Sequence, residues 1–523
     1  MNVKVREFRT PRLVLRTVLT GLSFVFAGVN VGQAGVCTWT NGVAGNWNLA
    51  SGWSNGVPTA SDDVIKVGNN LTLTNGVSMN TFALRSANGN HNFILGIGGS
   101  LTVSNVTTGL IGPVDYADAV GGFLVQQTNV VSDVVRSTTV GSRGLSVYAG
   151  AASQTARLTI TSGMTWNPQV GTDSTGPRVN IAGPVNQNGS LTLQGTITTS
   201  KGLNLGSSSA GTGSAEFVLD GGALVVNLIQ RSSCGNVNTD TVNFEFRSGT
   251  IKNSSSAGLI ISNNNTSTTF DLKLGNGGSR IFDATNGNIS VCATTRLVDL
   301  TTGGGFVKSG TGTLTLWDSN TYSGTAIISN GIMQLANTNV ASLSASSSLN
   351  VVNGAKFADA YELGRDLSFA LLLGSGTLNA AATNSTFIVT STLAPGDNGI
   401  GTLNVTTGCV QVAAGATYMC EVGGTTAAPT NDWVNLKGMN SAVSFGGAWT
   451  VKVKNVGTLN PTGKTFVLFD YTGANPVNLG TPILTFEGGE KWKGGQVIVD
   501  EVNTRVVLIG VVPVLRGTLI SVF

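Results

Sequence analysis

Histidine, charge and aromatic residues are all scarce in this chain. Its 523 residues include one histidine, His91, while 11% of the residues are charged and 7% are aromatic. A single histidine excludes metal sites that need several imidazole ligands. It would also have to serve any Ser-His-Asp or Cys-His mechanism, yet its neighbours are Asn90 and Asn92 and no partner that would orient it is evident. We therefore expect His91 to be a solvent-exposed turn residue.

Metal-binding and cofactor-binding patterns are also missing. The five cysteines form no Cys-x-x-Cys pair, which argues against zinc, and their odd number excludes complete intramolecular pairing. No Asp-x-Asp-x-Asp calcium loop occurs, and the glycine run 303–305 is interpreted as a turn because no helix is expected after it. We expect no metal and no cofactor. The disulfide pairing stays open for Cys37, Cys234, Cys292, Cys409 and Cys420.

Positive charge is concentrated at the N-terminus. The net charge is +3, and five basic residues lie before residue 17: Lys4, Arg6, Arg9, Arg12 and Arg16. The rest of the chain is close to neutral, so we expect no basic surface for nucleic acid.

The same N-terminal segment has the pattern of a secretory signal peptide. The basic region leads into the apolar stretch 18–27, and the small residues Gly32 and Ala34 precede a plausible cleavage point after Ala34. The apolar stretch is too short for a permanent anchor, and no later segment of about 18 apolar residues occurs. We expect residues 1–34 to direct export, and the mature chain to lie outside the cell or on its outer surface without a transmembrane helix.

The abundant residues are glycine, at 71 positions, together with Asn, Thr, Ser and short apolar groups. Segments such as 189–193 (Gly-Ser-Leu-Thr-Leu) and 312–316 (Gly-Thr-Leu-Thr-Leu) recur along the chain at irregular spacing. Alternate side chains of a strand point to one side, so each segment offers two apolar groups that stacked coils could bury together. This pattern predicts an all-β fold, a parallel β-solenoid. Tandem β-sandwiches, which also have short alternating strands, remain the alternative.

Changes in composition suggest a division into regions. After the signal peptide we expect a tryptophan-rich N-terminal cap at 35–68 and solenoid repeats at 69–393. A compact C-terminal β region with longer strands is expected at 394–512, followed by a short tail at 513–523.

Three clustered tryptophans are the main candidate binding residues. Trp39, Trp47 and Trp53 could stack on sugar rings, because an indole offers a flat apolar face with an N–H at its edge. They could equally cover the end of the solenoid, since repeat bodies need atypical terminal units. We favour the cap and retain glycan stacking as the alternative.

Paired carboxylates are the remaining route to catalysis, because they can hydrolyse or eliminate polysaccharides. Asp62 and Asp63 would point to opposite faces of a strand, and Asp220 precedes two glycines as a turn residue would. Outward, solvated positions are expected for the glutamates, and no acidic cluster flanked by Arg and Lys is evident. We therefore expect no enzyme. The carboxylates considered were Asp62, Asp63, Asp220, Asp240, Glu216 and Glu245.

Residues 304–335 resemble a known repeat. The segment 304–316 reads Gly-Gly-Phe-Val-Lys-Ser-Gly-Thr-Gly-Thr-Leu-Thr-Leu, and an Asn-Thr-Tyr-Ser-Gly turn and a short Gly-Ile-Met-Gln-Leu strand follow it. This is similar to the autotransporter-associated β-strand repeat, also called the passenger-associated transport repeat. More loosely, the whole chain resembles large exported proteins of planctomycetes and verrucomicrobia. The resemblance implies a right-handed parallel β-helix at the cell surface and no catalytic residue set.

These observations favour an exported structural or adhesive β-solenoid protein. The expected partners are extracellular polysaccharide, other cells or further copies of the chain. A carbohydrate-binding or polysaccharide-degrading β-helix protein is the alternative function.

Overall fold

The fold is that of a computed structural model, and the chain divides into residues 1–33 and 34–523. All described residues belong to the second unit, so the predicted signal peptide, His91, Asp62 and Asp240 lie outside them. The described residues are 36–39, 45–46, 48–58, 63–67, 71–73, 76–79, 81–85, 92–95, 100–103, 124–125, 145–147, 155–160, 165–166, 179–181, 188–199, 201–206, 213–232, 241–265, 268–338, 342–344, 347–396, 399–438, 441–474, 476, 478–487 and 492–514.

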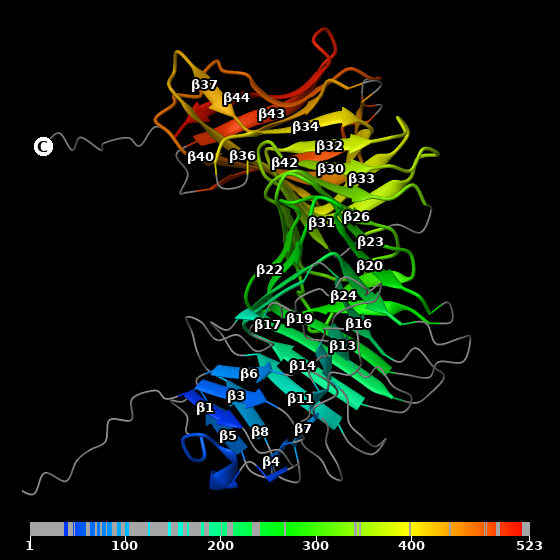
Figure 1. The fold of residues 1–523 in the computed structure, drawn as a ribbon. Coiled ribbons are helices and arrows are strands. Elements are labelled where there is room, and N and C mark those ends of the chain that lie inside the picture. Colours follow the sequence, from blue (N-terminus) through cyan, green and yellow to red (C-terminus); the bar gives the residue numbers. More distant parts are fainter. Residues whose placement is uncertain are drawn as a thin grey trace, which may run out of the picture. The chain divides into compact units, whose positions relative to one another are not determined.

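Two long sheets contain most of the strands (Figure 1). The first sheet has fifteen strands, in the order β10 (Leu145–Val147), β13 (Val179–Ile181), β16 (Gly202–Leu205), β18 (Leu228–Arg231), β20 (Leu259–Asn263), β23 (Ile289–Val291), β26 (Thr313–Leu316), β28 (Ile332–Leu335), β30 (Lys356–Asp359), β32 (Thr377–Ala380), β34 (Thr402–Thr407), β38 (Trp433–Leu436), β41 (Phe466–Tyr471), β44 (Arg505–Pro513) and β43 (Trp492–Asp500).

The second sheet has twenty strands, which are β11 (Thr155–Ile160), β12 (Thr165–Trp166), β14 (Asn188–Leu193), β15 (Thr196–Thr198), β17 (Ser214–Val226), β19 (Thr241–Asn253), β21 (Phe270–Leu274), β22 (Arg280–Asp283), β24 (Thr295–Asp299), β25 (Phe306–Ser309), β27 (Thr325–Ile328), β29 (Ser348–Val351), β31 (Asp366–Gly374), β33 (Thr386–Pro395), β35 (Cys409–Val412), β36 (Thr417–Gly424), β37 (Pro429–Asn431), β39 (Val443–Phe445), β40 (Ala448–Asn455) and β42 (Thr481–Glu487).

Smaller sheets lie at the start of the second unit. They are formed by β1 (Val36–Trp39), β3 (Asp63–Val67) and β6 (Thr81–Arg85); by β2 (Gly45–Asn46), β4 (Leu71–Leu73), β7 (Asn92–Leu95) and β9 (Leu124–Val125); and by β5 (Gly76–Met79) and β8 (Ser100–Val103). A 3-10 turn, η1 (Ala50–Gly52), lies between β2 and β3 in the sequence. Among the described residues, no helix is long and apolar enough to cross a membrane.

Successive coils stack in register, as the sequence predicts. Strand β26 pairs with β28 in parallel, with Leu314 opposite Met333 and Leu316 opposite Leu335, and all four side chains are buried. The outward residues between them are threonine or glutamine, so one coil supplies apolar cover to the next. The all-β parallel solenoid is therefore confirmed. The alternative of tandem sandwiches is wrong, because sandwich strands would pair antiparallel.

Glycine is required where coils approach most closely. A Cβ added to Gly324 would lie 2.3 Å from the carbonyl oxygen of Gly303, a residue of the preceding coil. Gly331 has a φ of +66°, which glycine adopts at no steric cost, at a corner of the same repeat. The glycines that punctuate the sequence thus allow tight corners and close stacking.

Parallel stacking continues across the region boundary expected at residue 394. Strand β33 contains that position, and the pairs β34–β38, β36–β40 and β40–β42 are parallel. Within the described residues, antiparallel pairing occurs between β36 and β37 and in the closing strands β41, β44 and β43. The parallel ladders therefore extend past residue 394, and the compact region expected at 394–512 stays a prediction.

Candidate functional site

The tryptophans expected near the N-terminus are largely buried. Trp39 is 0% exposed and Trp53 is 5% exposed, and their rings pack edge to face with centroids 5.1 Å apart. Two rings in this arrangement offer no open face to a sugar and contribute instead to a hydrophobic cluster. Trp47 lies outside the described residues, so stacking by that residue remains a prediction.

Three of the cysteines are described as free thiols. Cys292 and Cys409 are half-buried and Cys420 is buried, so Cys409 and Cys420 do not form the bridge that their spacing allows. Burial raises the pKa of Cys420, helped by the nearby charge of Asp432, which makes its thiolate hard to form. Within the part of the chain that the structure describes, no group of three or more His, Cys, Asp or Glu residues is placed to hold a metal.

The carboxylates Glu216 and Glu245 lie on adjacent strands and are joined by one amide. The Asn243 side chain donates hydrogen bonds to Glu216 (3.3 Å) and to Glu245 (2.9 Å). Arg247 donates to Glu245 at 2.8 Å. The expectation that no acidic cluster flanked by basic residues exists is wrong, because strand pairing β17–β19 unites residues that are 29 positions apart in the sequence.

Of this cluster, Glu245 and Arg247 line a hollow of about 620 Å³, which Asp220 and glycines 275, 277 and 278 also line. Burial by itself would raise the pKa of Glu245, but hydrogen bonds from Asn243 and Arg247 and the charges of Arg247 and Lys273 outweigh it, and the pKa is lowered. A glycosidase needs a carboxyl group that stays protonated near neutral pH as its general acid. Glu245 is poorly suited to that role, and the cluster acts as a polar ladder across the coils.

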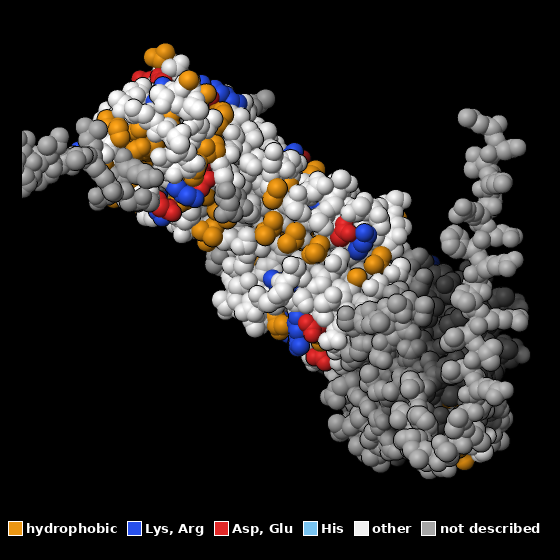
Figure 2. All heavy atoms as spheres, turned by 90° about the vertical axis from the view of Figure 1, so that its left-hand side faces the viewer, with side chains coloured by type: hydrophobic (Ala, Val, Ile, Leu, Met, Phe, Trp, Pro, Cys, Tyr) orange, Lys and Arg blue, Asp and Glu red, His pale blue; other side chains and the backbone are white. Residues whose placement is uncertain are grey.

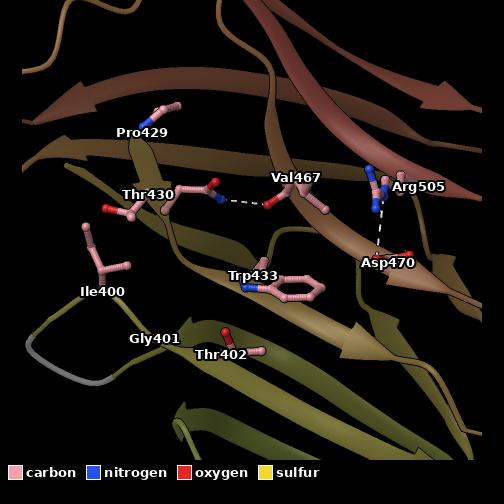
Figure 3. Close-up of a pocket in the computed structure, with 10 residues that line it drawn as sticks. Ile400, Gly401, Thr402, Pro429, Thr430, Trp433, Val467, Asp470 and Arg505 are labelled. Carbon is pink, nitrogen blue, oxygen red and sulfur yellow. Dashed lines mark hydrogen bonds and ion pairs between the residues drawn. The ribbon is translucent and has the colours of Figure 1, made fainter. Parts of the chain in front are cut away.

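A second hollow, of about 450 Å³, is centred on Trp433 at the start of β38. Trp433 points outward because the next residue, Val434, points into the core, and its ring is partly exposed. Figure 3 shows the indole between Thr402 and Asp470, with Ile400 and Thr430 toward one end and Arg505 toward the other. The volume lies within the ~300–1,000 Å³ range of ordinary ligand sites.

Charged groups border one end of this Trp433 hollow. Asp470 is 3% exposed. Its carboxylate forms ion pairs with Lys437 Nζ at 2.6 Å and with Arg505 Nε at 3.5 Å. Asp500 lies opposite Arg505 in the β43–β44 pair and is close enough for the charge of Arg505 to lower its pKa, although an Asn503 side-chain hydrogen bond is the larger cause. These four groups lie on the last strands of the first sheet or directly after one of them.

A buried carboxylate supports the floor of the Trp433 hollow. Asp432 is 1% exposed, and its two oxygens accept hydrogen bonds from the backbone N–H of Gly401 (2.8 Å) and of Glu421 (2.7 Å). Its own carbonyl oxygen accepts from the Tyr418 hydroxyl at 3.1 Å. Burial raises the pKa of Asp432 to about 7 despite these hydrogen bonds. Asp432 therefore fixes the loop at Gly401 against β36 and β38.

Sequence reasoning missed this hollow. Trp433 is an isolated tryptophan and lacks the close spacing that marks Trp39, Trp47 and Trp53 as a cluster. The available signal was Asn431-Asp432-Trp433, in which a polar pair precedes a strand that begins with an aromatic residue. This segment alone does not predict the hollow, because Asp470 and Arg505, which also line it, are distant in the sequence.

The repeat-like segment uses its polar residues to join coils. Lys308 is buried, and its Nζ donates to the carbonyl oxygens of Ser309 (2.8 Å), Gly310 (2.6 Å) and Asn330 (3.0 Å). Asn330 belongs to the following corner, so one ammonium group links two coils. Desolvation lowers the pKa of Lys308 to about 8, and Asp283 partly opposes this.

Asn320 and Tyr322 complete the same unit. The Asn320 side chain accepts from the backbone N–H of Leu297 (2.9 Å) and donates to the carbonyls of Asp318 (2.7 Å) and Ser342 (3.1 Å), which ties its own coil to a preceding and a following one. Tyr322 is buried, with its ring 5.3 Å from that of Phe306. Each of these residues has a structural role inside the stack.

Comparison with protein families agrees with this geometry. The model of the passenger-associated-transport-repeat family matches residues 306–335. The chain contains a passenger-associated transport repeat. A repeat of this family is typical of the β-helical passenger region of autotransporters, which is structural and exported. A search of curated proteins found no match.

Proposed function

We propose that this chain is a non-catalytic structural protein, displayed on the cell surface or released outside it, which mediates adhesion through its repetitive outer faces. The unbroken parallel ladders on either side of the passenger-associated transport repeat carry this proposal. Such a stack presents many similar outward positions at a rung spacing of about 4.8 Å, which suits repeated weak contacts with a matrix or another cell.

The polar residues of the described coils support a structural role. Lys308 and Asn320 bond to backbone groups inside the stack, and Glu216 and Glu245 are held by Asn243 and Arg247. The charged side chains in view in Figure 2 lie in small groups of mixed sign with uncharged surface between them. This surface favours contacts through hydroxyl and amide groups over strong electrostatic attraction.

Fractionation of the producing cells with an antibody against the purified chain tests the location. We expect the antigen in the medium or on intact cells, where added protease removes it, while a cytoplasmic marker enzyme stays intact. Antigen that resists protease until the cells are lysed would contradict surface display.

Deletion of the coding sequence tests adhesion. We expect lower attachment of the cells to a surface or to one another, restored by supplying the full chain. A reducing-sugar assay of the purified chain on soluble polysaccharides should stay at the blank, and a steady release of reducing ends would overturn the non-catalytic assignment.

A further inference from the structure

The Trp433 hollow combines an open aromatic face with free hydrogen-bonding groups. Among the described residues, no hydrogen bond engages the indole N–H of Trp433, the hydroxyl of Thr402 or the terminal nitrogens of Arg505. Thr430 adds an exposed hydroxyl at the rim, and Ile400 and Val467 supply apolar wall (Figure 3). A sugar ring has this mixed character, with C–H groups on its faces and hydroxyls around its edge, and indole faces are well suited to stack on it.

The polar groups at the rim are held in place before any ligand binds. The Asn431 side-chain amide donates to the carbonyl oxygen of Val467 at 2.6 Å, which leaves its carbonyl oxygen available as an acceptor. Asp470 attracts Arg505 through a 3.5 Å ion-pair contact, and Asp432 fixes the Gly401 loop from below. Groups that are already ordered lose little conformational entropy on binding.

The balance of charge indicates the kind of saccharide. Lys437 and Arg505 supply two positive charges near the hollow, and Asp470 and Asp500 supply two negative ones. Because these four charges cancel and Asp432 beneath the floor can add only negative charge, the site offers no net attraction for an acidic sugar. Hydrogen bonding and stacking are left as the main sources of affinity.

We propose that the Trp433 hollow is a binding site for a neutral saccharide chain, with one sugar ring stacked on the indole of Trp433 and neighbouring hydroxyls bonded to Thr402, Asn431 and Arg505. This inference adds a ligand site to the proposed structural role. It does not depend on that role, because it is tested on the purified chain rather than on cells.

Isothermal titration of the purified full chain with cellohexaose, xylohexaose, mannohexaose and chitohexaose tests the site. We expect saturable binding of at least one of them, and Trp433→Ala should weaken it at least tenfold. Trp433→Phe keeps a smaller ring and should lose less. Circular dichroism of both variants should match the wild type, because Trp433 points away from the core.

Trp317→Ala is the matched control. Trp317 is 38% exposed and its indole N–H is already bonded to Ser290 at 3.0 Å, so its removal should leave the affinity unchanged. Equal weakening by both alanine variants, or wild-type affinity in Trp433→Ala, would overturn the site. Failure to bind any neutral hexasaccharide, or binding of hexagalacturonate alone, would overturn the ligand class.

Discussion

The passenger-associated transport repeat and the coils around Trp433 both bury a charged side chain among backbone groups, but the charges have opposite sign. Lys308 donates to three carbonyls at the corners of two coils, whereas Asp432 accepts from two backbone amides. Burial lowers the pKa of the first and raises that of the second, because desolvation penalises either charged form.

The two regions differ in what their buried charge supports. Lys308 closes a regular corner of the repeat by bonding to carbonyl groups of two successive coils. Asp432 supports an irregular corner in which β37 turns back on β36 and leaves a hollow beside it. The regular corner strengthens the stack, and the irregular corner at β37 borders the Trp433 hollow.

Of the two buried charges, Asp432 should have the larger effect on the free energy of unfolding, and this effect should depend on pH. Its pKa of about 7 in the folded chain exceeds the value of 3.8 expected when unfolded, so the folded chain binds the proton more tightly. Stability from this group is complete below pH 4 and declines as the pH rises to about 7, by roughly 4 kcal/mol at most. Chemical unfolding of wild type and Asp432→Asn at pH 4 and pH 8 isolates this change.

The Asn variant cannot titrate at this position, and its amide can accept only one of the two backbone bonds. The wild type should therefore be the more stable protein at pH 4, and its advantage should shrink or reverse by pH 8. A difference that stays constant across this range would show that Asp432 remains ionised throughout.

Lys308→Met should come next in size. The substitution keeps the apolar stem but leaves the carbonyls of Ser309, Gly310 and Asn330 without this donor in a buried corner. We expect a loss of about 3 kcal/mol in the free energy of unfolding, together with faster hydrogen exchange across residues 306–335.

Lys356→Met is the control for that experiment. Lys356 begins β30, pairs in register with Ile332 of the same repeat, and is only partly buried. Its substitution should change stability by less than about 0.5 kcal/mol. Equal effects of the two substitutions would mean that the buried ammonium group adds nothing specific to the repeat.

Gly324→Ala should have a smaller effect of about 2 kcal/mol, because the added methyl group meets the backbone of the preceding coil and the stack must shift. Gly277→Ala is its partner experiment. No atom lies within 4 Å of a Cβ at Gly277, so that variant should be neutral or slightly more stable. Thermal unfolding followed by circular dichroism compares the two, and a tolerant Gly324 would show that the close approach is adjustable.

The fold was predictable because its signal is local. In Gly312-Thr313-Leu314-Thr315-Leu316, glycine marks the corner and the alternation marks the buried face, and both can be seen without knowing which coil lies next to it. The position at which antiparallel pairing begins in the first sheet was not predictable, because it depends on whether β41 meets a parallel or an antiparallel partner.

The candidate site could not be derived in the same way. Trp433 is partly exposed because Thr402 and Val467, from the flanking strands, leave room around its ring. Trp39 is buried because it packs against Trp53 and Gly52. The same residue type thus differs in exposure between the two positions, and the cause in each case is tertiary packing that a linear pattern does not contain.

Strand β37 lies outside the parallel ladders, since its one described pairing is the antiparallel contact with β36. The coils above and below are linked through β34, β38 and β41 without it. Replacement of this short excursion by another sequence would leave the ladder continuous while remaking one wall of the recess. Sequence variation at this corner can therefore change one wall of the recess, at the cost of the Asn431–Val467 hydrogen bond, while the ladder strands keep their pairing.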